Sequence, residues 1–182
     1  MPAPARYTFD SLRDEDLPLA RRWLLEPHVR RWWNDNPNET DYPAGTIADW
    51  LTAMHGTDPT DMMLIRMDGR PIGVIQSYRT DSYPDHVAEL GGLPEPAFEL
   101  DVFIGEPSLI GKGMGPELLR AFLLGAFERY GLDYCVIGPS RANVAAIRAY
   151  EKVGFRYLKD YREEDTSDPE HMLLDLRRSD LR

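Results

Sequence analysis

The chain has 182 residues, of which 42% are hydrophobic, and its formal net charge is −10 from 21 basic and 31 acidic side chains. This length and apolar fraction predict a single domain over residues 1–182 with a substantial core. The excess of acid disfavours a nucleic-acid partner, because a phosphate backbone would be repelled. No apolar run approaches the about 20 residues that cross a bilayer, and the first residues lack a signal-peptide core, so we expect a cytoplasmic protein without a membrane partner.

The first part of the chain is predicted to form one strand and two helices. The strand covers residues 7–12, and the helix after it covers 17–25 and is expected to stop at Pro27. Residues 28–37 combine aromatic side chains with turn formers, which predicts an aromatic loop or a short helical turn. The second helix covers 46–54.

A β-hairpin is predicted next. Its strands, 62–67 and 70–78, are separated by an Asp-Gly pair, which favours the tight turn between antiparallel neighbours. Residues 79–96 hold prolines, glycines and acids without periodicity, which predicts a long loop. A strand over 97–104 follows.

The rest of the chain alternates helix and strand, and then ends in two strands. The predicted ranges are 116–130 and 143–153 for the helices, and 134–137, 155–161 and 171–176 for the strands. This order predicts an α/β fold with a central mixed β-sheet of about six or seven strands, flanked by helices on both faces. The central strand–helix–strand unit should be parallel.

A glycine-rich loop precedes the helix at 116–130. It contains Gly111, Lys112, Gly113, Met114 and Gly115, and its glycines remove the side chains that would keep backbone N–H groups from phosphate oxygens. The helix start adds unpaired donors and a positive dipole. The loop is therefore predicted to bind a pyrophosphate, with an ordinary turn as the alternative.

The sulfur and imidazole side chains indicate no further chemistry. Cys135 lies in an apolar run, which predicts a buried small hydrophobe and not a nucleophile. The four histidines show no metal-ligand spacing with acids or with this cysteine, so no metal site is predicted.

Two motifs carry a resemblance to a known family. Residues 110–115, together with the block Asn143 to Phe155, resemble the GNAT family of acetyl-CoA-dependent N-acetyltransferases. Within that family the chain is most similar to aminoglycoside 6'-N-acetyltransferases, through Trp32-Trp33, residues 73–78 and Asp101. The resemblance implies a GNAT-like sheet, acetyl-CoA as the acyl-donor co-substrate, and a small cationic amine as acceptor.

The resemblance implies a set of residues that bind the acceptor amine. They lie on two strands and in the aromatic segment. Asp101 is the implied catalytic carboxylate, which would bind an ammonium group and accept its proton. Glu99 shares its strand face, and both acids could instead face solvent. The other implied substrate-binding residues are Trp32, Trp33, Gln76 and Tyr78, for which core packing of the tryptophans and edge-strand pairing are the alternatives.

The resemblance also implies which residues bind the acyl donor, acetyl-CoA. Tyr150 would act as the general acid near the thioester sulfur, with an ordinary helix-surface tyrosine as the alternative. Asn143 would contact the pantetheine arm as well as cap its helix, and Lys112 would pair with a phosphate unless it is simply solvated. Backbone groups of Val102, Phe103 and Ile104 would bind pantetheine as if pairing with another strand.

Three functional hypotheses remain open from the sequence. The first is acetyl transfer, by direct attack in a ternary complex, to the 6'-amino group of an aminoglycoside. The second keeps the chemistry but changes the acceptor to another amine, such as a siderophore-precursor hydroxylysine or a polyamine; it is favoured by Gly138, where the resemblance leads us to expect an acid. The third is a non-catalytic domain that binds coenzyme A. Either a monomer or a homodimer is compatible with the sequence.

Overall fold

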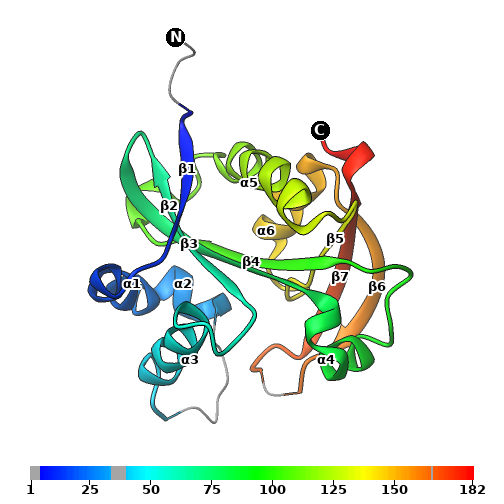
Figure 1. Cartoon of the computed structure of the whole chain (residues 1–182), viewed down its shortest axis with the longest axis horizontal. Helices are drawn as coiled ribbons and strands as arrows, with labels where there is room; N and C mark the ends of the chain where they lie inside the picture. Colours follow the sequence, from blue (N-terminus) through cyan, green and yellow to red (C-terminus); the bar gives the residue numbers. More distant parts are fainter. Residues whose placement is uncertain (1–4, 34–39, 165) are drawn as a thin grey trace. The chain divides into compact units, whose positions relative to one another are not determined.

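The computed structural model describes residues 5–33, 40–164 and 166–182 (Figure 1). The α-helices are α1 (Leu17–Leu24), α2 (Pro27–Trp33), α3 (Ala44–Met54), α4 (Pro84–Glu89), α5 (Gly115–Tyr130) and α6 (Val144–Val153). The strands are β1 (Tyr7–Ser11), β2 (Asp61–Met67), β3 (Arg70–Arg79), β4 (Phe98–Ile104), β5 (Tyr134–Ile137), β6 (Arg156–Arg162) and β7 (Glu170–Arg177). None of the helices in these three stretches has the length and apolar character that crossing a bilayer requires.

The strands form one mixed sheet. In the described residues it has seven strands, in the order β1-β2-β3-β4-β5-β7-β6. β1 runs antiparallel to β2, and β7 runs antiparallel to both β5 and β6, whereas β4 and β5 are parallel. The predicted mixed sheet is therefore confirmed, and so is the parallel pairing of its central strand–helix–strand unit.

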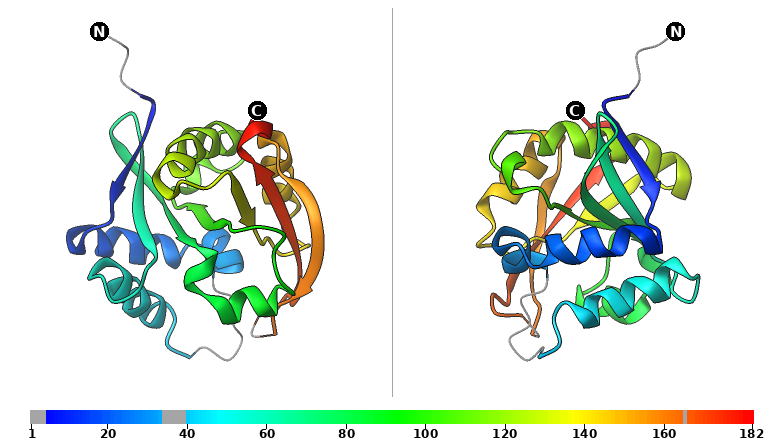
Figure 2. Two further views of the ribbon diagram at one scale, coloured as in Figure 1. Left: turned by 45° about the vertical axis from the view of Figure 1, so that its right-hand side comes forward. Right: turned by 90° about the vertical axis from the view of Figure 1, so that its left-hand side faces the viewer.

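The chain forms two compact units, of which the first contains the described residues 5–33, 41–76 and 101–112. In this unit α1, α2 and α3 are gathered at one end of β1 and β2 (Figures 1 and 2). Apolar side chains of the helices and strands form a core cluster, which contains Leu12, Ala20, Trp23, Leu24, Val29, Trp50, Met62, Leu64, Val74 and Phe103. Burial of these large side chains is what holds the helices against the strands.

Strands β3 and β4 approach each other closely in unit 1. The Gly105 N–H donates a hydrogen bond to the Ile72 carbonyl at 2.7 Å. A Cβ atom added at Gly73 would lie 2.1 Å from the carbonyl oxygen of Phe103. This separation is far below van der Waals contact, so position 73 requires glycine.

The second unit contains residues 40 and 77–100 and the described residues from 113 onward. Phe98 on β4 faces α5, with ring centroids 5.2 Å from Phe127 and 5.0 Å from Tyr130. Its neighbour Ala97 points to the opposite side of the strand and packs there in a second cluster with Leu90, Tyr134, Val136 and Leu173. In this unit the sheet is thus covered on one face by α5 and on the other by the segment that contains α4.

Two local predictions need correction. The predicted loop at 79–96 contains the short helix α4, which begins at Pro84. A helix of this length spans too few turns to leave an apolar periodicity in the sequence. Pro27 does not simply stop the first helix: α1 ends at Leu24, and Pro27 is the first residue of α2, a position where its missing N–H is not needed.

Candidate functional site

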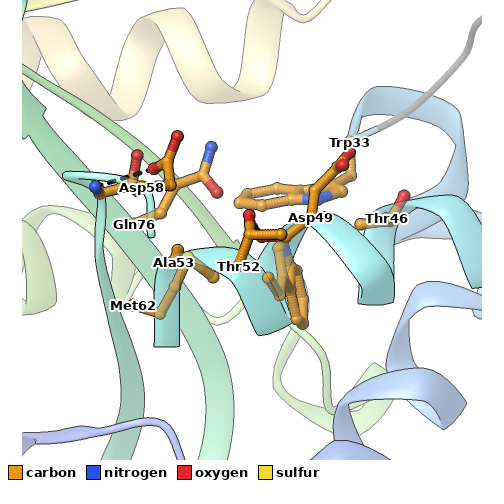
Figure 3. Close-up of a pocket in the computed structure, with 10 residues that line it drawn as sticks. Trp33, Thr46, Asp49, Thr52, Ala53, Asp58, Met62 and Gln76 are labelled. Carbon is orange, nitrogen blue, oxygen red and sulfur yellow. Dashed lines mark hydrogen bonds between the residues drawn. The ribbon is translucent and has the colours of Figure 1, made fainter. Parts of the chain in front are cut away.

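A pocket of about 340 Å³ opens in unit 1 between α3, the loop that follows it, and β3 (Figure 3). In Figure 3 the side chains of Gln76 and Asp58 lie on one side of this pocket and Trp33 lies on the other. The residues that line it are Trp33, Thr46, Asp49, Trp50, Thr52, Ala53, Asp58, Thr60, Met62 and Gln76. The pocket therefore combines aromatic surface with two carboxylates, hydroxyl groups and one amide.

The aromatic wall is part of the unit 1 core. Trp33 and Trp50 meet edge to face with centroids 6.0 Å apart, and Phe103 packs against both, at 4.7 Å from Trp33 and 6.3 Å from Trp50. Trp50 is buried and Trp33 half-buried. Trp33 therefore fits both alternatives that the sequence left open for the tryptophan pair: it packs against the core, and it also lines the pocket. Trp32 instead carries the Arg31 guanidinium over its ring, 4.5 Å from the centroid.

Sequence reasoning did not single out the two carboxylates that line this pocket. Asp49 is exposed on α3, next to Trp50 in the chain. Asp58 is half-buried in the loop after α3, where one of its oxygens accepts a hydrogen bond from the Thr60 N–H at 2.9 Å. An Asp-Pro-Thr turn was the available signal for Asp58, but nothing local relates it to Trp33.

Asp101 and Gln76 are brought together. The Gln76 Nε2 donates a hydrogen bond to Asp101 Oδ2 at 2.9 Å, and both side chains are half-buried. Asp101 is two residues before Phe103 on β4, so the two side chains lie on the same face of the strand. On that face the Phe103 ring contacts Trp33. The pair connects the predicted catalytic carboxylate to a residue that lines the pocket.

Glu99 has a different partner, which belongs to unit 2. It is only 4% exposed, and its carboxylate lies 3.0 Å from the Nε2 of His86 on α4. The Tyr78 ring stands edge to face with His86, at 6.4 Å between centroids, and with Tyr83, at 4.8 Å. Glu99 and Tyr78 are therefore both placed around His86, a residue that sequence reasoning considered only as a possible metal ligand.

Replacing Glu99 with glutamine is expected to lower the free energy of unfolding by about 1–2 kcal/mol, because a hydrogen bond to a buried charged group is weakened. Thermal or urea unfolding measures the change. Glu89→Gln is the matched control, since that carboxylate lies 3.9 Å from His86 Nδ1 but its side chain is 76% exposed. Equal stability of Glu99→Gln and the wild type would contradict a structural role for the pair, and a raised KM for the amine would support the predicted substrate role of Glu99.

The glycine-rich loop has a backbone that suits an anion. Gly111 and Gly113 have φ of +74° and +72°, and an added Cβ would meet nothing within 4 Å at either position. Within the described chain, the N–H groups of residues 111–114 donate no backbone hydrogen bond. Lys112 is exposed beside them, and α5 begins at Gly115. Left-handed glycines with unused donors next to a helix start fit the predicted pyrophosphate.

The other residues predicted to bind acetyl-CoA lie on α6, at its N-terminal cap and on β4. Tyr150 is 8% exposed and its ring centroid is 5.9 Å from that of Phe155. The Asn143 amide oxygen caps α6 by accepting the Ala146 N–H at 3.2 Å, which confirms the predicted cap. β4 pairs with β5 at Phe98 and Glu99 and runs on through Val102 and Phe103 to Ile104, whose carbonyl oxygen lies 3.0 Å from His28 Nε2.

Gly138 is held by a close neighbour in unit 2. The Tyr161 hydroxyl donates a hydrogen bond to the Gly138 carbonyl oxygen at 3.2 Å. A Cβ added at Gly138 would lie 2.2 Å from the same hydroxyl oxygen. The acid that the resemblance led us to expect at 138 could not fit there unless Tyr161 moved.

Buried ionisable groups on β5 are inert. Burial, with a smaller contribution from the Glu99 carboxylate, raises the pKa of the Cys135 thiol well above its ordinary value. Burial and donation of its hydroxyl to Asp175 likewise raise the pKa of Tyr134. A thiol that stays protonated is a poor nucleophile, which agrees with the prediction that Cys135 is a structural residue. In the part of the chain that the structure describes, no group of three or more His, Cys, Asp or Glu side chains could hold a metal ion.

Comparison with known proteins gives matches over most of the chain. A family model described as an acetyltransferase (GNAT) domain matches residues 13–162. The aminoglycoside N(6')-acetyltransferase type 1 of Klebsiella pneumoniae is 30% identical over 152 residues, which cover 81% of this chain and 73% of that protein.

Two solved structures illustrate the likeness in fold. Aminoglycoside acetyltransferase AAC(6')-Ib in complex with coenzyme A and kanamycin has a TM-score of 0.73 at 24% identity, over 95% of each chain. Spermidine N-acetyltransferase from Vibrio cholerae, in complex with CoA and spermine, has a TM-score of 0.72 at 16% identity, over 96% of this chain and 97% of that one. At these identities the structural likenesses concern the fold alone.

Proposed function

The chain belongs to the GNAT family of acetyltransferases, and from this premise we propose that it transfers the acetyl group of acetyl-CoA to the 6'-amino group of an aminoglycoside. The observation that carries the proposal is the unit 1 pocket, which joins the faces of Trp33 and Trp50 to the carboxylates of Asp49 and Asp58. Aromatic faces suit sugar rings and cations, and carboxylates attract ammonium groups. A polyamine sugar presents both kinds of surface.

In the proposed reaction Asp101 binds the ammonium group of the acceptor and takes one of its protons. The neutral amine then attacks the thioester carbonyl, so that a C–N bond forms and the C–S bond breaks, and the second proton of the nitrogen passes to the departing CoA thiolate. Acetyl-CoA supplies the acetyl group in an activated thioester form. Residues 111–115 bind its pyrophosphate through backbone N–H groups, while Asn143 and the backbone of β4 hold the pantetheine arm. Tyr150 donates a hydrogen bond to the departing sulfur. Neither the deprotonation of the amine nor the transfer of the acetyl group needs a metal ion.

A second candidate acceptor is favoured by one observation. Position 138, where we expect a carboxylate for an aminoglycoside enzyme, is a glycine, and the Tyr161 hydroxyl occupies the space beside it. A smaller amine, such as a polyamine or a hydroxylysine of a siderophore precursor, would depend less on that carboxylate. The likeness in fold to a spermidine acetyltransferase is compatible with this alternative.

Thiol release from acetyl-CoA tests the proposal across a panel of amines. With kanamycin, tobramycin, spermidine and N6-hydroxylysine as acceptors, we expect the highest kcat/KM for the two aminoglycosides. Release of CoA only with spermidine or hydroxylysine would contradict an aminoglycoside as the acceptor, but would still support acetyl transfer to an amine. A calorimetric signal on titration with CoA, without turnover of any amine, would instead identify a non-catalytic CoA-binding domain.

A further inference from the structure

We propose that Gln76 is a positioning residue for Asp101: its amide fixes the rotation of the carboxylate that receives the acceptor amine. This inference rests on the proposed function and deepens it, because the sequence had suggested either substrate contact or edge-strand pairing for Gln76. Its basis is the hydrogen bond from Gln76 Nε2 to Asp101 Oδ2, at 2.9 Å across β3 and β4.

The two strands give this hydrogen bond a rigid support. They are joined in unit 1 by the hydrogen bond from Gly105 N–H to the Ile72 carbonyl, and position 73 tolerates no side chain against Phe103. Val74, two residues before Gln76, is fully buried, and Phe103, two residues after Asp101, is 8% exposed in the same core. The backbone positions of both partners are therefore set by packing, which leaves side-chain rotation as the main freedom to be removed.

An amide removes that freedom without competing for the proton. A carboxylate turns readily about its terminal torsion, and such terminal torsions are broad. The Gln76 Nε2 can only donate, so it holds one oxygen of an ionised Asp101 and cannot accept a proton from the acceptor amine. A fixed carboxylate presents the amine in one orientation, and loss of such orientation by about 1 Å can cost about 10²-fold in rate.

The place of Gln76 in the pocket allows a competing role. Its side chain lines the cavity beside Asp58, so it could simply bind the acceptor (Figure 3). The two roles have different kinetic signatures. A residue that only binds substrate raises KM when it is removed, whereas a residue that orients the reacting carboxylate lowers kcat.

Two substitutions separate these roles. For Gln76→Leu we expect kcat to fall about 10- to 100-fold while KM for the amine changes by less than about threefold. Gln76→Glu keeps the shape of the side chain, but its new carboxyl can donate to Asp101 only while it is protonated. The activity of Gln76→Glu relative to the wild type should therefore fall about tenfold or more between pH 5.5 and pH 8.5, as that proton is lost. The other pocket carboxylates, Asp49 and Asp58, are the same in both proteins, so their effects on activity largely cancel in the ratio.

Thr8→Val, an exposed change on β1, is the control and should leave kcat, KM and the pH profile unchanged. Circular dichroism verifies folding, and the isosteric Gln76→Glu decides the question if Gln76→Leu does not fold. The proposal is overturned if Gln76→Leu raises KM at constant kcat, or if the activity ratio of Gln76→Glu is independent of pH. Absence of turnover by the wild-type protein with every amine would overturn the proposed function as well, so the two failures are distinguished by the wild-type assay.

Discussion

Asp101→Asn is expected to lower kcat for amine acetylation by about 10²- to 10³-fold, which lies in the lower part of the range that a positioned general base contributes. Asparagine keeps the size of the side chain but can neither carry the negative charge that attracts an ammonium group nor accept its proton. The amide pair with Gln76 can re-form through the asparagine oxygen, so the fold around the pocket should persist. Steady-state thiol release at saturating acetyl-CoA measures the change.

The control for this variant is Asp10→Asn. Asp10 lies on β1, where its half-exposed carboxylate accepts a hydrogen bond from Arg66 at 2.9 Å, and it is not among the residues that line the pocket. The Asp10→Asn variant should retain the kcat of the wild type. If Asp101→Asn binds CoA normally and turns over at more than about a third of the wild-type rate, Asp101 is not the base.

Gly73→Ala is expected to lower the free energy of unfolding by about 3 kcal/mol, at the upper end of the cost of overpacking. The new Cβ would lie 2.1 Å from the Phe103 carbonyl oxygen and 3.0 Å from the Ile104 Cα, both backbone atoms that cannot rotate away. Strands β3 and β4 would have to separate, and these are the strands that carry Gln76 and Asp101. We therefore also expect kcat to fall in whatever fraction remains folded, with urea unfolding as the primary measurement.

Gly125→Ala supplies the matched comparison. Gly125 is exposed on α5, and an added Cβ there would meet nothing within 4 Å. Alanine should stabilise the helix by about 0.5–1 kcal/mol, because glycine is the weaker helix former. A Gly73→Ala protein as stable as the wild type would show that β3 and β4 do not pack as described.

The sequence predicted best those elements whose signals are local. The hairpin of β2 and β3 follows from Asp68-Gly69, α5 follows from its apolar periodicity, and the start of α6 follows from the Asn143 cap. Helix α4 was missed because six residues do not establish a period. Pro27 was misjudged because proline both ends helices and begins them.

The candidate site was predictable only in part, since its geometry depends on pairs distant in the chain. Asp101 and Gln76 could each be named from the sequence, but their hydrogen bond joins residues 25 positions apart. The attachment of Glu99 to His86 and the place of Asp58 beside Gln76 likewise required the packed strands and helices. A single sequence carries local propensities and patterns, whereas such contacts arise from tertiary packing.

The position of the acetyl group on the product tests the central claim most directly. Kanamycin treated with the wild-type protein and acetyl-CoA should yield one product, and two-dimensional NMR should place its acetyl group on the 6'-nitrogen. Acetylation at another amine of the sugar, or complete recovery of unmodified kanamycin while spermidine is acetylated under the same conditions, would contradict the account.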